Sequence, residues 1–209
     1  MNDTSIQSSV PKLLQQFTEG DPLAFAALVK RYQGPLLGFA RGMLGSRGSH
    51  EDVVQEAFLR LARKPPSLSE VGLNPDQGAA HLNAWLHRVT RNLCVDVMRS
   101  EMKRREREQF VANSEATAGG LATVEANDTR AAVERGLDQL PPEQREVLVL
   151  RLLGEKSYRE IADITGKKLG TIGWLISRGI STLSRELGSL IETESTSSNN
   201  KNTDGLNLA

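Results

Sequence analysis

Apolar residues recur along this chain at intervals of three and four, the spacing that gathers them on one face of an α-helix. No segment shows the strict alternation of apolar and polar residues that a half-buried β-strand requires. The first apolar stripe follows Asp21-Pro22, where aspartate can cap a helix and proline can occupy its first turn. Gly34-Pro35 interrupts this stripe before it resumes over residues 36–44, so the pattern predicts two helices separated at that point.

Two more helices are predicted in the first half of the chain. Ser49 and Asp52 resemble a capping box ahead of an apolar stripe over residues 53–61, and Lys64-Pro65-Pro66 is expected to end that helix. After a loop at residues 67–80, a long helix is expected from about His81 to about Gln109. The residues expected on its apolar side are Trp85, Leu86, Val89, Leu93, Cys94, Val97 and Met98.

The second half begins after a change in composition. Residues 113–128 are small and polar, contain glycine and lack periodicity, which is typical of a flexible linker. A new helical unit is expected from about Thr129, with a break at Leu140-Pro141-Pro142 before a helix over residues 143–153. After Glu192 the composition is that of a disordered tail. The chain is therefore predicted to be all-α, with two small helical domains joined by a flexible acidic linker.

Residues 157–183 carry the spacing of a helix-turn-helix. Ser157 and Glu160 form a capping box at the start of the first helix. Ala162 is small enough for the second helix to approach, Gly166 can adopt the positive φ of the tight turn, and Ile172 can bury the inner face. An ordinary helical hairpin with a glycine turn is the alternative.

The second helix of such a motif enters the major groove of DNA. Its outward set is poor in the side chains that usually read bases. Trp174 could pack on a sugar or a thymine methyl group, or it could be buried against a neighbouring helix or a partner protein, and the pattern leaves both open. The outward positions are Lys168, Leu169, Gly170, Gly173, Trp174, Ser177 and Arg178.

Charge is unevenly distributed, although 26 basic and 26 acidic residues give a net charge of zero. Residues 85–105 carry six basic and two acidic groups, and residues 145–185 carry eight and four. The segment between them, 106–144, carries three basic and eight acidic groups. Two basic segments separated by an acidic one suggest two contacts with a polyanion, although an ordinary solvated helix surface gives similar counts.

Several classes of protein are excluded by composition. A single cysteine cannot form an internal disulfide or a cysteine-based metal site, which fits a reducing cytoplasm. His50, His81 and His87 do not have ligand spacing and no glycine-rich phosphate loop occurs, so we expect no enzyme, no metal and no cofactor. No apolar run approaches the ~18 residues of a membrane span. Residues 1–11 lack the order of a signal peptide.

Two separated parts of the chain resemble a known family, the bacterial sigma factors of the extracytoplasmic-function (ECF) type. LPPEQREVLVLRLLGEKSYREIADITGKKLGTI resembles their fourth conserved region. DPLAFAALVKRYQGPLLGFARGML, SHEDVVQEAFLRLAR and AWLHRVTRNLCVDVMRSEMKRRER resemble their second region. The resemblance implies an N-terminal extension at 1–19, region 2 at 20–110, a linker at 111–128, region 4 at 129–188 and a disordered tail at 189–209.

The resemblance also implies which residues of region 2 act. A mixed acidic and apolar helix would bind the RNA polymerase core through Asp52, Gln55, Glu56 and Phe58. The alternative is that Phe58 and Leu59 are core residues, and for Leu59 we favour the core. The long helix would bind the downstream (−10) promoter element. The first five residues proposed for this contact follow helical periodicity and share one broad face. The full set is Arg88, Arg91, Asn92, Asp96, Arg99, Lys103 and Arg104.

Region 4 would bind the upstream (−35) element, and here the sequence departs from the family. The family usually carries basic residues where this chain has Gly173–Ile176 and Ile180. Upstream binding is therefore expected to be weaker, differently read or partly replaced by a protein contact. The residues expected at this element are Lys168, Thr171, Trp174, Ser177 and Arg178.

The leading hypothesis is a sigma factor that binds RNA polymerase core and directs promoter-specific initiation. Its expected partners are core polymerase, promoter DNA and an anti-sigma factor, with no membrane insertion and a cytoplasmic location. A stand-alone dimeric helix-turn-helix regulator is the first alternative, but it leaves the basic helix of the first half unexplained. An adaptor whose degenerate helix-turn-helix binds only protein is the second.

Overall fold

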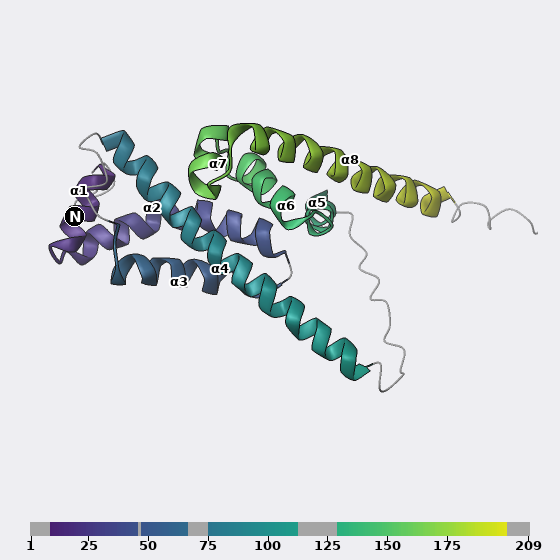
Figure 1. Cartoon of the computed structure of the whole chain (residues 1–209), viewed down its shortest axis with the longest axis horizontal. Coiled ribbons are helices and arrows are strands. Elements are labelled where there is room, and N and C mark those ends of the chain that lie inside the picture. Colours follow the sequence, from purple (N-terminus) through teal and green to yellow (C-terminus); the bar gives the residue numbers. More distant parts are fainter. Residues whose placement is uncertain (1–8, 46, 67–74, 113–128, 200–209) are drawn as a thin grey trace, which may run out of the picture.

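The computed structural model describes residues 9–45, 47–66, 75–112 and 129–199, with side chains up to Glu108 and, in the second half, for Val133 and residues 135–185. Within these ranges all regular structure is helical, as the sequence predicts (Figure 1). The predicted linker at 113–128 and the last residues of the predicted tail, 200–209, lie outside the described residues.

The first half of the chain is built around α2. Asp21 accepts a hydrogen bond from the Leu23 amide at 2.9 Å, and Ser49 accepts one from the Asp52 amide at 3.1 Å, so both predicted N-caps are confirmed. The helix α1 lies within the segment interpreted as an N-terminal extension, and it buries Val10 and Leu13 against the other helices. The helices of this half are α1 (Val10–Thr18), α2 (Pro22–Leu44), α3 (His50–Arg63) and α4 (Pro75–Ala112).

The predicted interruption at Gly34-Pro35 is wrong, because α2 is continuous through Pro35. Both residues lie on the exposed side of the helix, where water can satisfy the carbonyl that loses its partner at a proline. On the other side Leu28 and Leu36 are fully buried along one stripe. Burial of this stripe outweighs the local cost of an internal proline.

The start of α4 was also predicted wrongly. The helix begins at Pro75, six residues before the expected start, and its first turns pack on α2 through buried Leu82 and a Tyr32 hydroxyl that donates to the Ala79 carbonyl at 3.5 Å. Further along, Leu86 and Cys94 are fully buried, as expected for the apolar side. The remaining residues predicted for that side, Trp85, Val89, Leu93, Val97 and Met98, are partly buried.

The second half holds the helix-turn-helix. The helix predicted over 143–153 exists, but its last turn switches to π-helical hydrogen bonding, with the Gly154 amide donating to the Val149 carbonyl at 3.0 Å. The last helix continues to Asn199, beyond residue 188, where the disordered tail was expected to follow. The elements are α5 (Thr129–Asp138), α6 (Pro142–Leu148), the π-turn η2 (Val149–Leu153), α7 (Tyr158–Thr165) and α8 (Leu169–Asn199).

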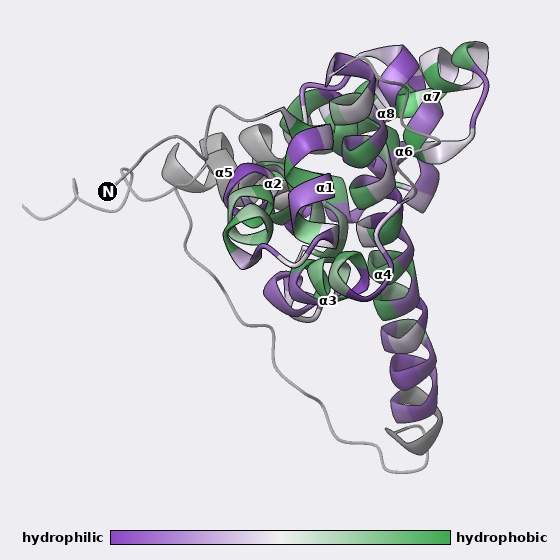
Figure 2. Ribbon diagram, turned by 90° about the vertical axis from the view of Figure 1, so that its left-hand side faces the viewer, coloured by the Kyte–Doolittle hydropathy of each residue, from purple (hydrophilic) through white to green (hydrophobic). Residues whose placement is uncertain are grey.

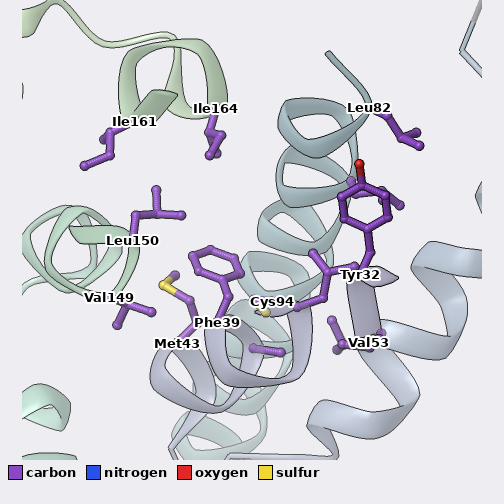
Figure 3. Packing of buried hydrophobic residues seen from close by; sticks show 14 of the residues in the cluster. Tyr32, Phe39, Met43, Val53, Leu82, Cys94, Val149, Leu150, Ile161 and Ile164 are labelled. Atoms are coloured by element: carbon purple, nitrogen blue, oxygen red, sulfur yellow. The ribbon is translucent and has the colours of Figure 1, made fainter. Parts of the chain in front are cut away.

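The two halves share one hydrophobic core. Val149 and Leu150 of η2 face Phe39 and Met43 of α2 across the junction (Figure 3). Gly42 permits this approach, because a Cβ there would lie 2.8 Å from Val149 Cγ1. Beyond this core, the turns of α4 up to Glu108 are mostly hydrophilic (Figure 2).

Candidate nucleic-acid interface

The helix-turn-helix forms as its sequence predicts. The Ser157 amide donates to Glu160 Oε2 at 2.8 Å, and the Glu160 amide donates to Ser157 Oγ at 3.3 Å, which completes the capping box. Burial alone would raise the pKa of Glu160, but the hydrogen bonds from Ser157 lower the pKa overall and keep the carboxylate charged. Gly166 has φ +73° and donates its amide to the Ala162 carbonyl at 2.8 Å, ending α7 in the left-handed turn.

The inner face of α8 fixes which of its residues point outward. Ile172, Leu175 and Ile176 are buried against the rest of the second half. The predicted −35 residues Lys168, Thr171, Trp174, Ser177 and Arg178 are all exposed. Trp174 is 62% exposed, so burial against a neighbouring helix of this chain is excluded for it.

The exposed part of the predicted −10 face lies on the C-terminal two-thirds of α4. Asp96 faces Arg99 at 4.0 Å with both side chains about 70% exposed, and Arg104 pairs with Glu101 at 2.9 Å. Such exposed pairs are weak and leave the arginines available to a polyanion. The exposed members of the predicted set are Arg88, Asn92, Asp96, Arg99, Lys103 and Arg104.

Arg88 and Arg91, the first residues of that predicted set, are instead engaged by the second half of the chain. Arg91 Nε donates to Glu146 Oε1 at 2.6 Å, and Arg91 Nη2 donates to Glu146 Oε2 at 3.5 Å. Arg88 Nη2 donates to the Asp163 carbonyl at 2.8 Å. Glu146 is only 3% exposed, so this ion pair closes the start of the basic face beneath α6 and α7.

A second polar cluster joins the halves at Arg145, which is 2% exposed. Its Nε donates to the Leu137 carbonyl at 2.6 Å, and its Nη1 donates to the Met43 carbonyl at 3.0 Å and lies 3.1 Å from Asp138 Oδ1. Asp138 also pairs with Arg47 at 2.9 Å. Sequence reasoning missed this cluster, although an arginine beside the apolar run that begins at residue 147 was a usable signal.

The predicted polymerase-binding helix α3 places one residue differently from the expectation. Phe58 is 7% exposed and belongs to the core, whereas Leu59 is 42% exposed. The assignment of Leu59 to the core is therefore wrong, because Val54, Phe58 and Leu61 follow the helical spacing and Leu59 falls outside it. Asp52 and Gln55 are exposed, and Glu56 pairs with Arg60 at 3.0 Å.

Some polar groups are buried without a partner in the part of the chain that the structure describes. They are His87 Nε2 and Thr90 Oγ1 on α4, and a third is Gln144 Oε1 on α6. Burial lowers the pKa of His87 to about 4, although its hydrogen bond to the Asn83 carbonyl opposes the shift. Burial likewise raises the pKa of the Cys94 thiol to about 12, which agrees with its expected place on the apolar side of the long helix and makes the thiol unreactive.

A hollow runs along α4 where it meets α5 and α6. It consists of two cavities of about 380 and 290 Å³ that share Met98, Met102 and Pro142. Arg99 and Glu143 line the smaller cavity, and the larger one reaches Arg47 and Asp138. The lining of the hollow combines apolar side chains, among them Met98 and Met102, with charged ones.

Comparison with protein families identifies both halves. Residues 28–104 match the family description Sigma-70 region 2, and residues 130–183 match Sigma-70, region 4. The ECF RNA polymerase sigma factor SigW of Bacillus subtilis (strain 168) is 27% identical over 198 residues, covering 88% of this chain and 100% of the relative. The ECF RNA polymerase sigma factor EcfG of Rhodopseudomonas palustris (strain TIE-1) is 33% identical over 155 residues, covering 71% of this chain and 77% of the relative.

Two solved structures have a similar fold. CnrH, solved in complex with the cytosolic domain of CnrY, has a TM-score of 0.61 and 25% identity and covers 87% of this chain and 99% of its own. The sigma factor RpoE from Bartonella quintana, solved with the anti-sigma factor NepR, has a TM-score of 0.56 and 25% identity, with 78% and 96% covered.

The fold and the two matches define a class of protein, the transcription initiation factors built from sigma-70 regions 2 and 4. Within that class, the chain belongs to the ECF RNA polymerase sigma factor family. It is a subunit that directs RNA polymerase to promoters, and the two alternatives raised by the sequence are not favoured. In the part of the chain that the structure describes, no helix combines the length and the apolar character of a membrane span.

Proposed function

We propose that this sigma factor divides its work among three helices. The exposed basic face of α4 contacts the −10 element, the outward face of α8 contacts the −35 element, and α3 contacts core polymerase. The observation that carries the proposal is that one chain presents two separate faces suited to DNA, one on a capped helix-turn-helix and one on a long basic helix. On this proposal, the contribution of the protein to initiation is binding energy.

The proposed polymerase contact uses the outward residues of α3. Asp52 and Gln55 are exposed, and Glu56 is partly exposed beside them. Leu59 lies one turn further along and adds an apolar group to this acidic face, whereas Phe58 supports it from the core. An acidic face with one apolar side chain complements a basic partner helix.

The contacts of Arg88 and Arg91 imply that the protein opens before it engages a promoter. Elements centred about 25 base pairs apart lie roughly 85 Å apart along B-DNA, at ~3.4 Å per base pair. In the arrangement described above, α4 and α7 are in direct contact. We therefore propose that this is a closed form of the protein. In it, two arginines proposed for the −10 contact are bound within the chain, Arg91 to Glu146 and Arg88 to the Asp163 carbonyl.

An anti-sigma factor is the proposed inhibitory partner. The sigma factor RpoE was solved with the anti-sigma factor NepR, and CnrH was solved with the cytosolic domain of CnrY. In this chain the hollow along α4, with Met98 and Met102 in its lining, would suit an apolar segment of such a partner. Since its other partners are polymerase and promoter DNA, we propose that the protein acts in the cytoplasm.

Run-off transcription tests the proposal, with purified core polymerase and a library of random promoter fragments. Initiation that requires this protein is expected to select two sequence elements. Binding to core without selected initiation would contradict the assignment of the DNA faces, and failure to bind core would contradict the role of α3.

Arg99→Ala tests the −10 face specifically. Arg99 is highly exposed and only weakly paired, so its loss should leave the fold intact. Removal of one charge-assisted contact to DNA should slow open-complex formation about tenfold. Core binding measured by gel filtration should be unchanged, and Arg31→Ala, which removes an exposed arginine of α2, provides a matched control. Equal loss of core binding and open-complex formation would indicate misfolding and contradict the assignment.

A further inference from the structure

The outward face of α8 has an unusual side-chain composition for a helix that reads DNA. Between Lys167 and Arg185 the sequence contains no asparagine, glutamine, aspartate or glutamate. The exposed cations near its start and middle are Lys168 and Arg178, and the exposed hydroxyl groups include Thr171 and Ser177. The most exposed large apolar side chain there is Trp174, at 62%.

The chemistry of the major groove limits which bases these side chains can recognise. Adenine is normally read by asparagine or glutamine, and cytosine by an acidic side chain, so neither base has its usual partner here. Guanine can be read by Arg178 or Lys168. Thymine alone displays a methyl group in the groove, and apolar side chains recognise it.

The geometry of α8 leaves Trp174 free to make such a contact. Buried Ile172 and Leu175 fix the inner face, so the indole on the other side points away from the protein core. Gly170 precedes Trp174 by one turn, and a Cβ at Gly170 would meet no atom within 4 Å. Neither Gly170 nor Gly173 has a side chain that could stand between the indole and the floor of a groove.

We propose that Trp174 determines promoter specificity by contacting thymine methyl groups in the upstream element. The inference rests on the proposed function of α8, and it names the chemical group that this helix reads. Arg178, one turn after Trp174, anchors the same face on a guanine or a phosphate. Recognition of the upstream element thus depends on a methyl group more than on hydrogen bonds to base edges.

Deoxyuridine substitution tests the proposal, because it removes the thymine methyl group and keeps the Watson–Crick pair. Holoenzyme binding is measured on a selected promoter in which each upstream thymine is replaced in turn. At one or more positions the deoxyuridine should weaken binding by the unaltered protein about fourfold. That factor corresponds to the ~0.8 kcal/mol gained by burying one methylene-sized group. Trp174→Ala holoenzyme should bind the thymine and deoxyuridine promoters equally, and Trp174→Phe should keep part of the discrimination.

Two controls separate the possible outcomes. Ile180→Ala removes another exposed apolar side chain of α8, 45% exposed and on a different face, and should retain the full response to deoxyuridine. Unchanged melting temperatures should show that Trp174→Ala folds, since the indole is largely outside the core.

Footprinting of the upstream element provides a second measurement. If Arg178→Ala weakens upstream protection but no deoxyuridine substitution weakens binding, the thymine proposal is overturned. It is also overturned if Trp174→Ala holoenzyme still binds the thymine promoter more tightly than the deoxyuridine promoter. If neither Arg178→Ala nor Lys168→Ala alters upstream protection, α8 does not bind this element, and the proposed function of α8 fails together with the inference.

Discussion

At the scale of single residues, His87 gives the stability of the protein a pH dependence. Burial beside Phe39 lowers its pKa to about 4, with Lys156 also lowering the pKa and Glu160 opposing the shift. In the unfolded chain the pKa is near 6.5, so the unfolded state binds the proton first as the pH falls. Above about pH 7 the imidazole is neutral in both states, so its full contribution to the free energy of unfolding is present. About 3 kcal/mol of that free energy should be lost by pH 4.

Urea unfolding between pH 7.5 and 4 measures this loss, and His87→Phe removes the titrating group while keeping a ring in the site. The carboxylates Glu143 and Glu160, whose pKa values are lowered, contribute stability that is lost only further down the pH scale. Subtraction of the His87→Phe curve should therefore isolate a step between pH 6.5 and 4. Parallel curves for the two proteins would show that His87 is not buried as a neutral group.

Phe58, Leu59 and Trp174 show what the sequence could decide for individual residues. Phe58 could have been placed in the core, because it follows Val54 by four residues and precedes Leu61 by three. The family resemblance instead favoured Phe58 at the surface, and Leu59 was assigned to the core. Trp174 could not be placed from periodicity alone, since its exposure depends on which other helices cover α8.

At the scale of elements, local chemistry was predicted well and long-range packing was not. Ser49, Ser157 and Gly166 act on backbone groups within four residues, so their caps and turn could be read directly from the sequence. Pro35 was misjudged because the continuity of α2 depends on other helices that bury its opposite side. The start of α4 depends in the same way on packing against α2.

Gly166→Ala should weaken the helix-turn-helix through the backbone alone. At φ +73° a Cβ is strained, while no atom lies within 4 Å of the position it would take. The free energy of unfolding should fall by about 1 kcal/mol, measured with urea. Gly166→Asn is the matched control, because asparagine tolerates the left-handed region, and it should lose less. Equal losses for the two variants would mean that backbone conformation is not the cause.

At the scale of the whole molecule, the joining of the two halves was outside the reach of the sequence. Arg91 and Glu146 are 55 residues apart, and Arg145 and Met43 are 102 apart. The charge distribution predicted two basic regions but not that an acidic residue of the second half would cover the first. Both regions were recognised as DNA-binding candidates, whereas their closure depends on specific geometry between distant residues.

Gly42→Ala tests whether the halves form a closed body in solution. The added Cβ would lie 2.8 Å from Val149 Cγ1 and 2.9 Å from Leu153 Cδ1, so the junction must shift. Overpacking of this kind should cost about 1–3 kcal/mol and increase the radius of gyration measured by small-angle X-ray scattering.

The matched control for that junction is Gly38→Ala, one turn earlier on the exposed side of α2, where a Cβ meets nothing within 4 Å. Alanine favours a helix interior by about 1 kcal/mol over glycine, so this variant should be more stable and no larger. A Gly42→Ala protein with the stability and size of the Gly38→Ala protein would rule out the close junction.

Cys94 sets a limit on how the transcription that this protein directs can be controlled. It is the only cysteine of the chain, it is fully buried, and its thiol stays protonated at physiological pH because burial raises its pKa to about 12. Thiolates, not thiols, react with oxidants and disulfides. The folded protein thus has no means of forming a disulfide switch within itself, and a thiol-based oxidative signal must be sensed by another molecule and passed on through a protein contact.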